Sequence, residues 1–213
     1  MKGRPAVLAV FVTCLAVPAA AQKVRLTPHI GFYIPTERLY DLASGSQGDD
    51  FQLEAGPSFG ARLGMWFGNR FGMEVGGSYV PTTFLLGGGG SPVSQDAKLF
   101  IGSAQMVLFL LPPSGPLSVF LTGGLAAVSR GGVAFTNETT TTNLGGVFGA
   151  GAGLNLGPIS LTAGADLVTY KADYRGSYAT TQQLSQKDIN LKLGFGIPFG
   201  GGGGGGGRGG AGR

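Results

Sequence analysis

Cysteine, histidine and charge are all scarce in this chain, and each shortage removes a class of function. The 213 residues include one cysteine, Cys14, and one histidine, His29. A disulfide needs two cysteines and a zinc site needs several suitable ligands, so neither is expected. Only 12% of the residues are charged and the formal net charge is +4, too weak and scattered to indicate nucleic acid. We therefore expect no cofactor, no metal and no nucleic-acid partner.

The N-terminal segment has the features of a secretory signal peptide. It has a basic start at Lys2 and Arg4, an apolar stretch over about 6–17, and small residues at Ala19-Ala20-Ala21. The alternative is a membrane-anchor helix, but the stretch is shorter than the roughly 20 residues that span a bilayer. We expect Sec-type export and cleavage of residues 1–21. Cleavage would remove Cys14 and lower the net charge from +4 to +2.

Long hydrophobic runs are missing from the rest of the chain, which shows alternation instead. Between Phe51 and Phe67 every odd-numbered residue is apolar, while the even positions carry charge, hydroxyl groups, glycine and Trp66. This period of two is that of a β-strand, whose successive side chains point to opposite faces. A soluble sheet buries its apolar face against a second layer, whereas a membrane barrel points that face at lipid. Without a spanning helix, only strands can carry this chain through a membrane.

The alternation recurs along the chain, and the connections between the alternating segments are alternately short and long. Short, turn-forming connections lie at 68–70, 112–115 and 157–158, and longer polar or glycine-rich ones at 36–50, 86–97, 130–143 and 173–186. Short turns at one rim and long loops at the other are typical of bacterial outer-membrane barrels. We predict an all-β fold, an eight-stranded antiparallel transmembrane β-barrel over 22–199, with a disordered glycine-rich tail at 200–213. The predicted strands are 24–35, 51–67, 71–84, 98–111, 116–129, 144–156, 159–172 and 187–199.

Strand parity places a polar cluster inside this barrel. If Phe67 pairs with Phe71 across the short turn, Arg62 and Glu74 become diagonal neighbours on the inward face. An eight-stranded barrel is just wide enough for its side chains to fill. We interpret the cluster as a structural, self-satisfied core, with an ion or proton path as the alternative. Its members are Arg25, Arg62, Glu74, Asp166 and Lys192.

Two details of the inward face also favour filling over conduction. The glycines Gly149, Gly151 and Gly153 leave a trough for a large neighbour such as Phe120 or Trp66. The segment 98–111 is apolar on both faces, but Ser103 and Gln105 indicate that its odd-numbered face points inward.

The chain thus resembles the small eight-stranded outer-membrane barrels, the OmpA/OmpX-type and opacity-like outer-membrane β-barrel domain family. The resemblance covers residues 23–199 and rests on the strand pattern and on the ending Ile197-Pro198-Phe199. In that family the chain usually stops at the final aromatic residue, whereas here 14 residues follow Phe199. The resemblance implies a monomer in a Gram-negative outer membrane, surrounded by lipid and lipopolysaccharide and inserted by the barrel-insertion machinery.

Three functions remain open at this stage. Outer-membrane enzymes that modify lipid A pair a histidine with a serine near the rim, but His29 lies inside a strand and no H-x-S spacing occurs. We therefore predict no catalytic site. We expect an outer-membrane protein with a structural or surface-interaction role and a filled lumen. The alternative is a narrow pore or conduit for small solutes, and a lipid-modifying enzyme ranks third.

Overall fold

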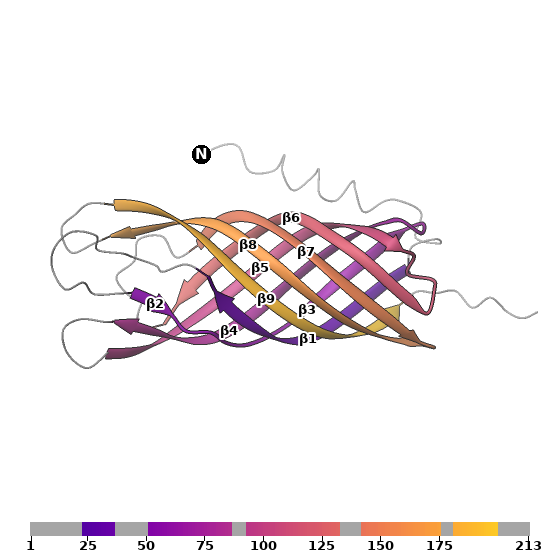
Figure 1. The fold of residues 1–213 in the computed structure, drawn as a ribbon, viewed down its shortest axis with the longest axis horizontal. Helices are drawn as coiled ribbons and strands as arrows, with labels where there is room; N and C mark the ends of the chain where they lie inside the picture. Colours follow the sequence, from indigo (N-terminus) through magenta and orange to yellow (C-terminus); the bar gives the residue numbers. More distant parts are fainter. Residues whose placement is uncertain (1–22, 37–50, 87–92, 133–141, 176–180, 200–213) are drawn as a thin grey trace, which may run out of the picture.

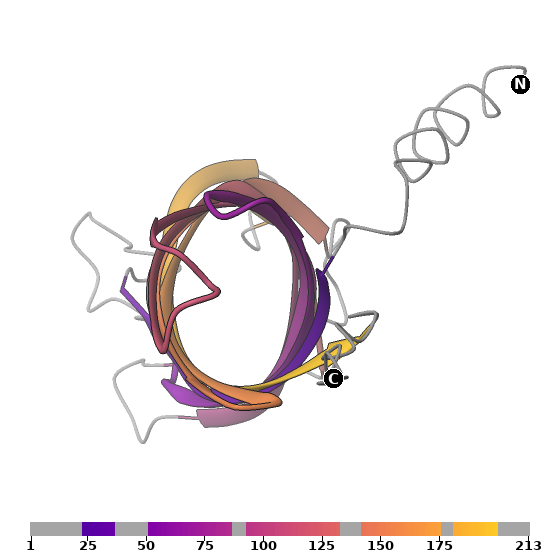
Figure 2. The same cartoon turned by 90° about the vertical axis from the view of Figure 1, so that its right-hand side faces the viewer.

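The computed structural model describes residues 23–36, 51–86, 93–132, 142–175 and 181–199, and these form a closed antiparallel barrel (Figure 1). Each strand lies beside its neighbour in the chain, and the first and last strands pair to close the wall. Seen along its axis, the barrel is a complete ring (Figure 2). The strands are β1 (Lys23–Pro35), β2 (Phe51–Leu53), β3 (Gly56–Phe67), β4 (Phe71–Leu86), β5 (Val93–Leu111), β6 (Leu117–Gly131), β7 (Thr142–Leu156), β8 (Ile159–Arg175) and β9 (Thr181–Phe199).

The predicted all-β fold is confirmed, since β2 and β3 are two parts of one of the eight wall strands. No helix within the described residues is long and apolar enough to cross a membrane. The proposed signal peptide at 1–21 and the tail at 200–213 lie outside the described residues. We call the end with the short turns at 68–70, 112–116 and 157–158 the turn end, and the opposite end the loop end.

The unbroken strand predicted over 51–67 is wrong. Both parts pair with β4, but Leu53 lies opposite Phe84 and Phe59 opposite Tyr79, so β2/β3 holds one residue more than its partner between these pairs. This extra residue makes a bulge around Glu54, which reverses the alternation of the two faces. Leu53 is therefore buried in the lumen at 2% exposure rather than facing outward with the other odd-numbered residues.

Several strands continue past their predicted loop-end boundaries. The β4–β5 pairing runs to Leu86 and Val93, and the β8–β9 pairing to Arg175 and Thr181. Polar residues such as those at 181–183 hide these extensions from a hydrophobic pattern, although backbone hydrogen bonds are available to any residue but proline. The connections after β4, β6 and β8 are correspondingly shorter than predicted, whereas the one after β1 has the predicted length.

The wall is sheared by ten residues. When the partners are followed from strand to strand around the barrel, the path that starts on β1 returns to β1 ten residues further along. The path is Val24, Met65, Met73, Met106, Gly123, Phe148, Leu167, Ile189 and Ile34. Closing a barrel requires such a stagger, together with tilted strands.

The seam between β1 and β9 is interrupted once. Leu26 pairs with Ile197, and the ladder resumes where His29 pairs with Gly194. Pro28 lies in this interval and has no N–H group to donate to a neighbouring strand. The pairing of β1 with β3 continues through the same residues without a gap, so the interruption affects only the closing seam.

The two faces of the wall differ as the alternation requires. Large apolar side chains such as Leu63, Phe148 and Leu193 are exposed on the outer face. The inner face buries the polar residues, and on β5 the odd-numbered residues from Leu99 to Phe109 point inward. An exposed apolar band around the barrel is the surface that a lipid bilayer covers.

Candidate functional site: the barrel lumen

Aromatic side chains line the lumen at the turn end. The rings of Trp66 and Phe109 meet edge to face with centroids 5.0 Å apart, and Phe109 contacts Phe120 at 5.9 Å. The Arg25 guanidinium lies 5.7 Å from the Trp66 ring centroid, within cation–π range. Four strands thus contribute one large side chain each to a single layer.

Inward glycines make room for these large side chains. A Cβ atom on Gly151 would lie 2.5 Å from the Phe120 ring, and one on Gly72 would lie 2.2 Å from the Trp66 ring. The trough at Gly151 therefore accommodates Phe120, whereas Trp66 packs over Gly64 and Gly72 instead. Phe120 and Trp66 each lie across a glycine of an adjacent strand, because the narrow lumen has no space for two side chains there.

Two ion pairs form a belt above the aromatic layer. Arg62 Nη1 donates to Glu74 Oε2 at 3.2 Å, and Lys192 Nζ donates to Asp166 Oδ2 at 2.5 Å. All four residues are at most 9% exposed. Phe67 does pair with Phe71, which places Arg62 opposite Gly76 and Glu74 opposite Gly64. The structure thus brings four of the five cluster residues together in pairs.

Arg25, the fifth cluster residue, has no such partner. Within the described residues, its guanidinium makes no ion pair and no hydrogen bond; it lies over Trp66, and Glu74 attracts it from beyond ion-pair distance. It lies between two cavities of different size. The first cavity has a volume of about 10 Å³ and is also lined by Arg62, Glu74 and Phe120. This is about the space that one water molecule needs.

The second cavity is an open vestibule of about 440 Å³ at the turn end. Residues of all three short turns line it, together with the beginning of β1 and the end of β9. Arg25 and Trp66 belong to its lining and to that of the small cavity, so these two side chains separate the vestibule from the ionic belt. Asn155 holds one of the turns in place by donating to the carbonyls of Pro113 and Gly115.

A histidine–serine contact lies beside the belt. His29 Nε2 is 3.0 Å from Ser78 Oγ, a distance suited to a base and a nucleophile. However, the two side chains are only 5% and 3% exposed, and His29 Nδ1 has no hydrogen-bond partner to orient the ring. Within the described residues no group of His, Cys, Asp and Glu could hold a metal ion. The pair has neither the access nor the third residue of a hydrolytic site.

The loop end of the lumen is mainly apolar, although Arg130 and Asp188 are also buried there. Tyr33, Val80, Leu99 and Val128 are each 0% exposed and belong to one cluster of buried side chains. This apolar cluster also contains Leu53, Ala97, Ile101, Ala126, Val147, Val168, Tyr170 and Ala172. A smaller polar network accompanies it, in which the Tyr170 hydroxyl donates to Asp188 at 2.9 Å.

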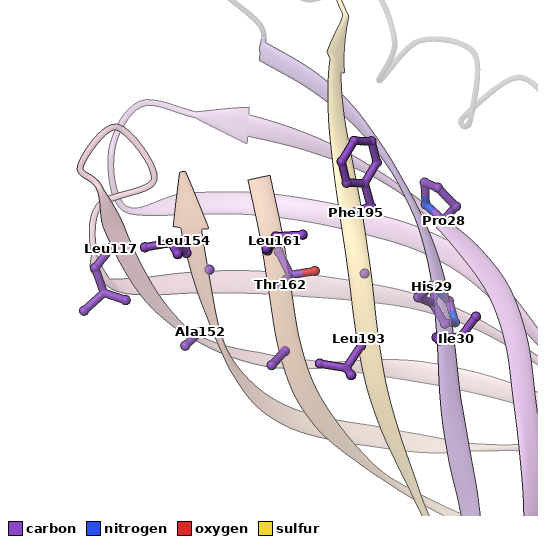
Figure 3. A pocket seen from close by; sticks show the side chains of 13 residues that line it. Pro28, His29, Ile30, Leu117, Ala152, Leu154, Leu161, Thr162, Leu193 and Phe195 are labelled. Carbon is purple, nitrogen blue, oxygen red and sulfur yellow. The ribbon is translucent and has the colours of Figure 1, made fainter. Parts of the chain in front are cut away.

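A hollow of about 670 Å³ lies on the outer, lipid-facing side of the wall (Figure 3). Ala152 and Ala163 pair directly across β7 and β8, and their small side chains form its floor. Larger residues such as Leu154, Leu193 and Phe195 surround it. The hollow faces the apolar band rather than the lumen, so it adds no chemistry to the site.

Sequence reasoning missed the contacts that join strands beyond one hairpin. Ser78 lies two strands away from His29, and Ser58 donates to Asn190 at 2.9 Å across the closing seam. Hydroxyl residues on inward positions were the available signal, but pairing them requires the register around the whole barrel.

The comparisons with known proteins agree with this architecture. The family model for the outer membrane protein beta-barrel domain matches residues 7–199, and the chain belongs to this family. It is an outer-membrane β-barrel of Gram-negative type, as the resemblance implied. The comparison with curated protein sequences finds no match.

Several solved structures are similar to the chain at low sequence identity, and one of them has a TM-score above 0.5. Neisserial surface protein A is 15% identical with a TM-score of 0.51, covering 84% of this chain and 97% of that one. The N-terminal β-barrel domain of Pseudomonas aeruginosa OprF is 14% identical with a TM-score of 0.44, covering 83% and 97%. Ail from Yersinia pestis, solved with the heparin analogue sucrose octasulfate, is 15% identical with a TM-score of 0.43, covering 84% and 98%.

Proposed function

We propose that this protein is a non-enzymatic outer-membrane barrel with a structural or surface-interaction role and a filled lumen. The observation that carries the proposal is the stacking of the aromatic layer beneath the buried ion pairs, with a cavity of about 10 Å³ between that layer and the Arg62–Glu74 pair. Ions crossing the lumen would have to displace Trp66 or Phe120 and then break a buried ion pair. Breaking such a pair costs several kcal/mol.

We further propose that export follows the Sec route and that the short turns face the periplasm. The support is the alternation of short and long connections, which in such barrels places the long loops outside. Surface roles would then fall to the loop end. Cysteines introduced at Ser46 and Asn69 distinguish the orientations: an impermeant reagent on intact cells should label only the first.

Single-channel recording in planar bilayers tests the filled lumen. We expect a silent barrel, with the double variant Trp66→Ala/Phe120→Ala showing conductance steps because it removes the aromatic layer. Steps from the unmodified protein would instead support the alternative function, a narrow pore or conduit for small solutes. The unheated gel mobility of both proteins serves as the folding control.

The His29–Ser78 contact bears on the third candidate, a lipid-modifying enzyme. We propose that this pair is a structural hydrogen bond, because its burial and the unpartnered Nδ1 atom argue against turnover. A serine-directed phosphonate probe should leave Ser78 unmodified in the folded protein. Modification of Ser78 would instead support the third candidate function, a lipid-modifying enzyme.

A further inference from the structure

We propose that the vestibule at the turn end binds a carboxylate side chain of an acidic peptide, with Arg25 as the residue that recognises it. The volume of about 440 Å³ lies in the range of roughly 300–1,000 Å³ that is typical of small-molecule sites. This site lies at the opposite end from the surfaces considered under the proposed function, and its chemistry does not depend on whether the lumen conducts.

The first argument is the state of Arg25. It lines the vestibule, is only half-buried, and forms no ion pair or hydrogen bond within the described residues, where Glu74 attracts it from beyond ion-pair distance. Its stem passes close to Gly196 and its guanidinium lies over Trp66, so the side chain is held in one place. A held guanidinium with free N–H groups matches the two oxygens of a carboxylate.

The second argument is the charge of the turn end. Within the described residues of this end, Glu74 is the only carboxylate, and Arg62 already neutralises it. Arg25 and Arg70 form no ion pair within the described residues, and Lys23 at the beginning of β1 adds a further positive charge to this end. The turn end comprises residues 23–28, 61–74, 105–120, 153–163 and 194–199. This end attracts anions, and electrostatic attraction of this kind guides charged partners to a site.

The third argument is the lining of the vestibule, which selects among anions. Arg25 is the one charged residue of the lining, and the rest is polar at Asn69 and Ser114 or apolar at Pro113 and Phe199. A single guanidinium balances one negative charge, whereas a phosphate dianion would keep an unbalanced charge against apolar groups. An organic carboxylate with an aliphatic stem therefore fits better than inorganic phosphate.

The chain provides its own reporter for the test, because Trp66 is its only tryptophan and lies in the vestibule lining. The full mature protein, folded in nanodiscs, is titrated with the peptide Ala-Glu-Ala while Trp66 fluorescence is recorded. The peptide is acetylated at its N-terminus and amidated at its C-terminus, so that the glutamate side chain is its one carboxylate. The matched peptide Ala-Gln-Ala, blocked in the same way, and inorganic phosphate are the comparison probes. We expect a saturable change with the glutamate peptide at a concentration at least about tenfold lower than with either comparison probe.

The variants assign the effect to one side chain. Arg25→Gln should weaken binding of the glutamate peptide about tenfold or more, because a hydrogen bond to a charged group is lost. Arg70→Gln is the matched control: it removes a charge from the same end but not from the vestibule, and should change binding less than about twofold. Arg25→Lys keeps the charge and should fall between the two, which preserves the test if Arg25→Gln fails to fold.

Several results would overturn the proposal. Equal binding of the glutamate and glutamine peptides would remove the role of charge, and equally tight binding of phosphate would make the site a general anion site. Unchanged binding by Arg25→Gln, or an equal loss in Arg70→Gln, would remove the role of Arg25. Gel mobility before and after heating confirms that each variant is folded.

Discussion

The two ends of the lumen are packed in different ways. At the turn end a few large or charged side chains lie across glycines, as Phe120 does over Gly151 and Trp66 over Gly72. At the loop end many medium-sized apolar side chains such as Leu99 and Val128 meet one another, and the charges of Arg130 and Asp188 are confined to the surroundings of Tyr170. The first arrangement depends on particular pairs of residues, whereas the second depends on total volume. At the turn end, the effects of two substitutions in one contacting pair on the free energy of unfolding should therefore not add up. At the loop end, each substitution should change the free energy of unfolding independently.

The largest expected effect tests the paired charges of the belt. Arg62→Met alone leaves Glu74 buried without its partner, and should reduce the free energy of unfolding by about 3–5 kcal/mol. The double variant Arg62→Met/Glu74→Leu removes both charges and should be close to neutral. Reversible unfolding in urea with lipid present measures both. A double variant as unstable as the single one would show that the pair is not a unit.

A slightly smaller effect is expected at the loop end. Leu99→Ala should cost about 2–5 kcal/mol in the same measurement, because a fully buried side chain leaves a cavity that the wall cannot close. Leu121→Ala is the matched control on the lipid-facing side, where Leu121 is 44% exposed and lipid can occupy the space. We expect the control to lose less by at least about 1 kcal/mol. Equal losses would mean that the apolar cluster does not behave as a packed core.

The smallest effect tests the packing of large side chains over glycine. Gly151→Ala should cost about 1–3 kcal/mol, since its Cβ would lie 2.5 Å from the Phe120 ring. Adding Phe120→Leu should restore part of the loss by shortening the ring side chain in contact, while the contact of the new Cβ with the Ala163 carbonyl oxygen at 2.8 Å remains. Gly123→Ala is the control on the outer face, where the nearest atom is 3.6 Å away, and should be neutral. If Phe120→Leu restored no stability, the loss in Gly151→Ala would not come from contact with the Phe120 ring.

The sequence carried enough information for the fold and for contacts within one hairpin. The tight turn at 68–70 sets the register of β3 and β4, which is why the proximity of Arg62 and Glu74 follows from parity alone. Lys192 and Asp166 could be placed on inward positions of adjacent strands, but their connection is long and does not set a register. His29 and Ser78 could not be paired at all, because a third strand lies between them.

Three other features could not be predicted, one for a local reason and two because they depend on distant parts of the chain. Leu53 continues the apolar alternation of the following strand, so the bulge at Glu54 leaves no trace in the pattern. The vestibule is built by three turns far apart in the sequence, and no turn alone indicates it. Arg25 was placed inside the barrel, yet its lack of a partner depends on where every carboxylate lies.

The shear of ten residues links all these contacts to the diameter of the barrel. A path through paired residues around the wall begins at Val24 and returns to the same strand at Ile34. The rows of paired residues therefore follow a helix around the barrel rather than closed rings. If any one pair of strands slipped by two residues, the shear would change and the whole barrel would widen or narrow. Phe120 would then lose its fit over Gly151, and Arg62 its reach to Glu74. The contacts between the lumen side chains can therefore all form at only one barrel diameter.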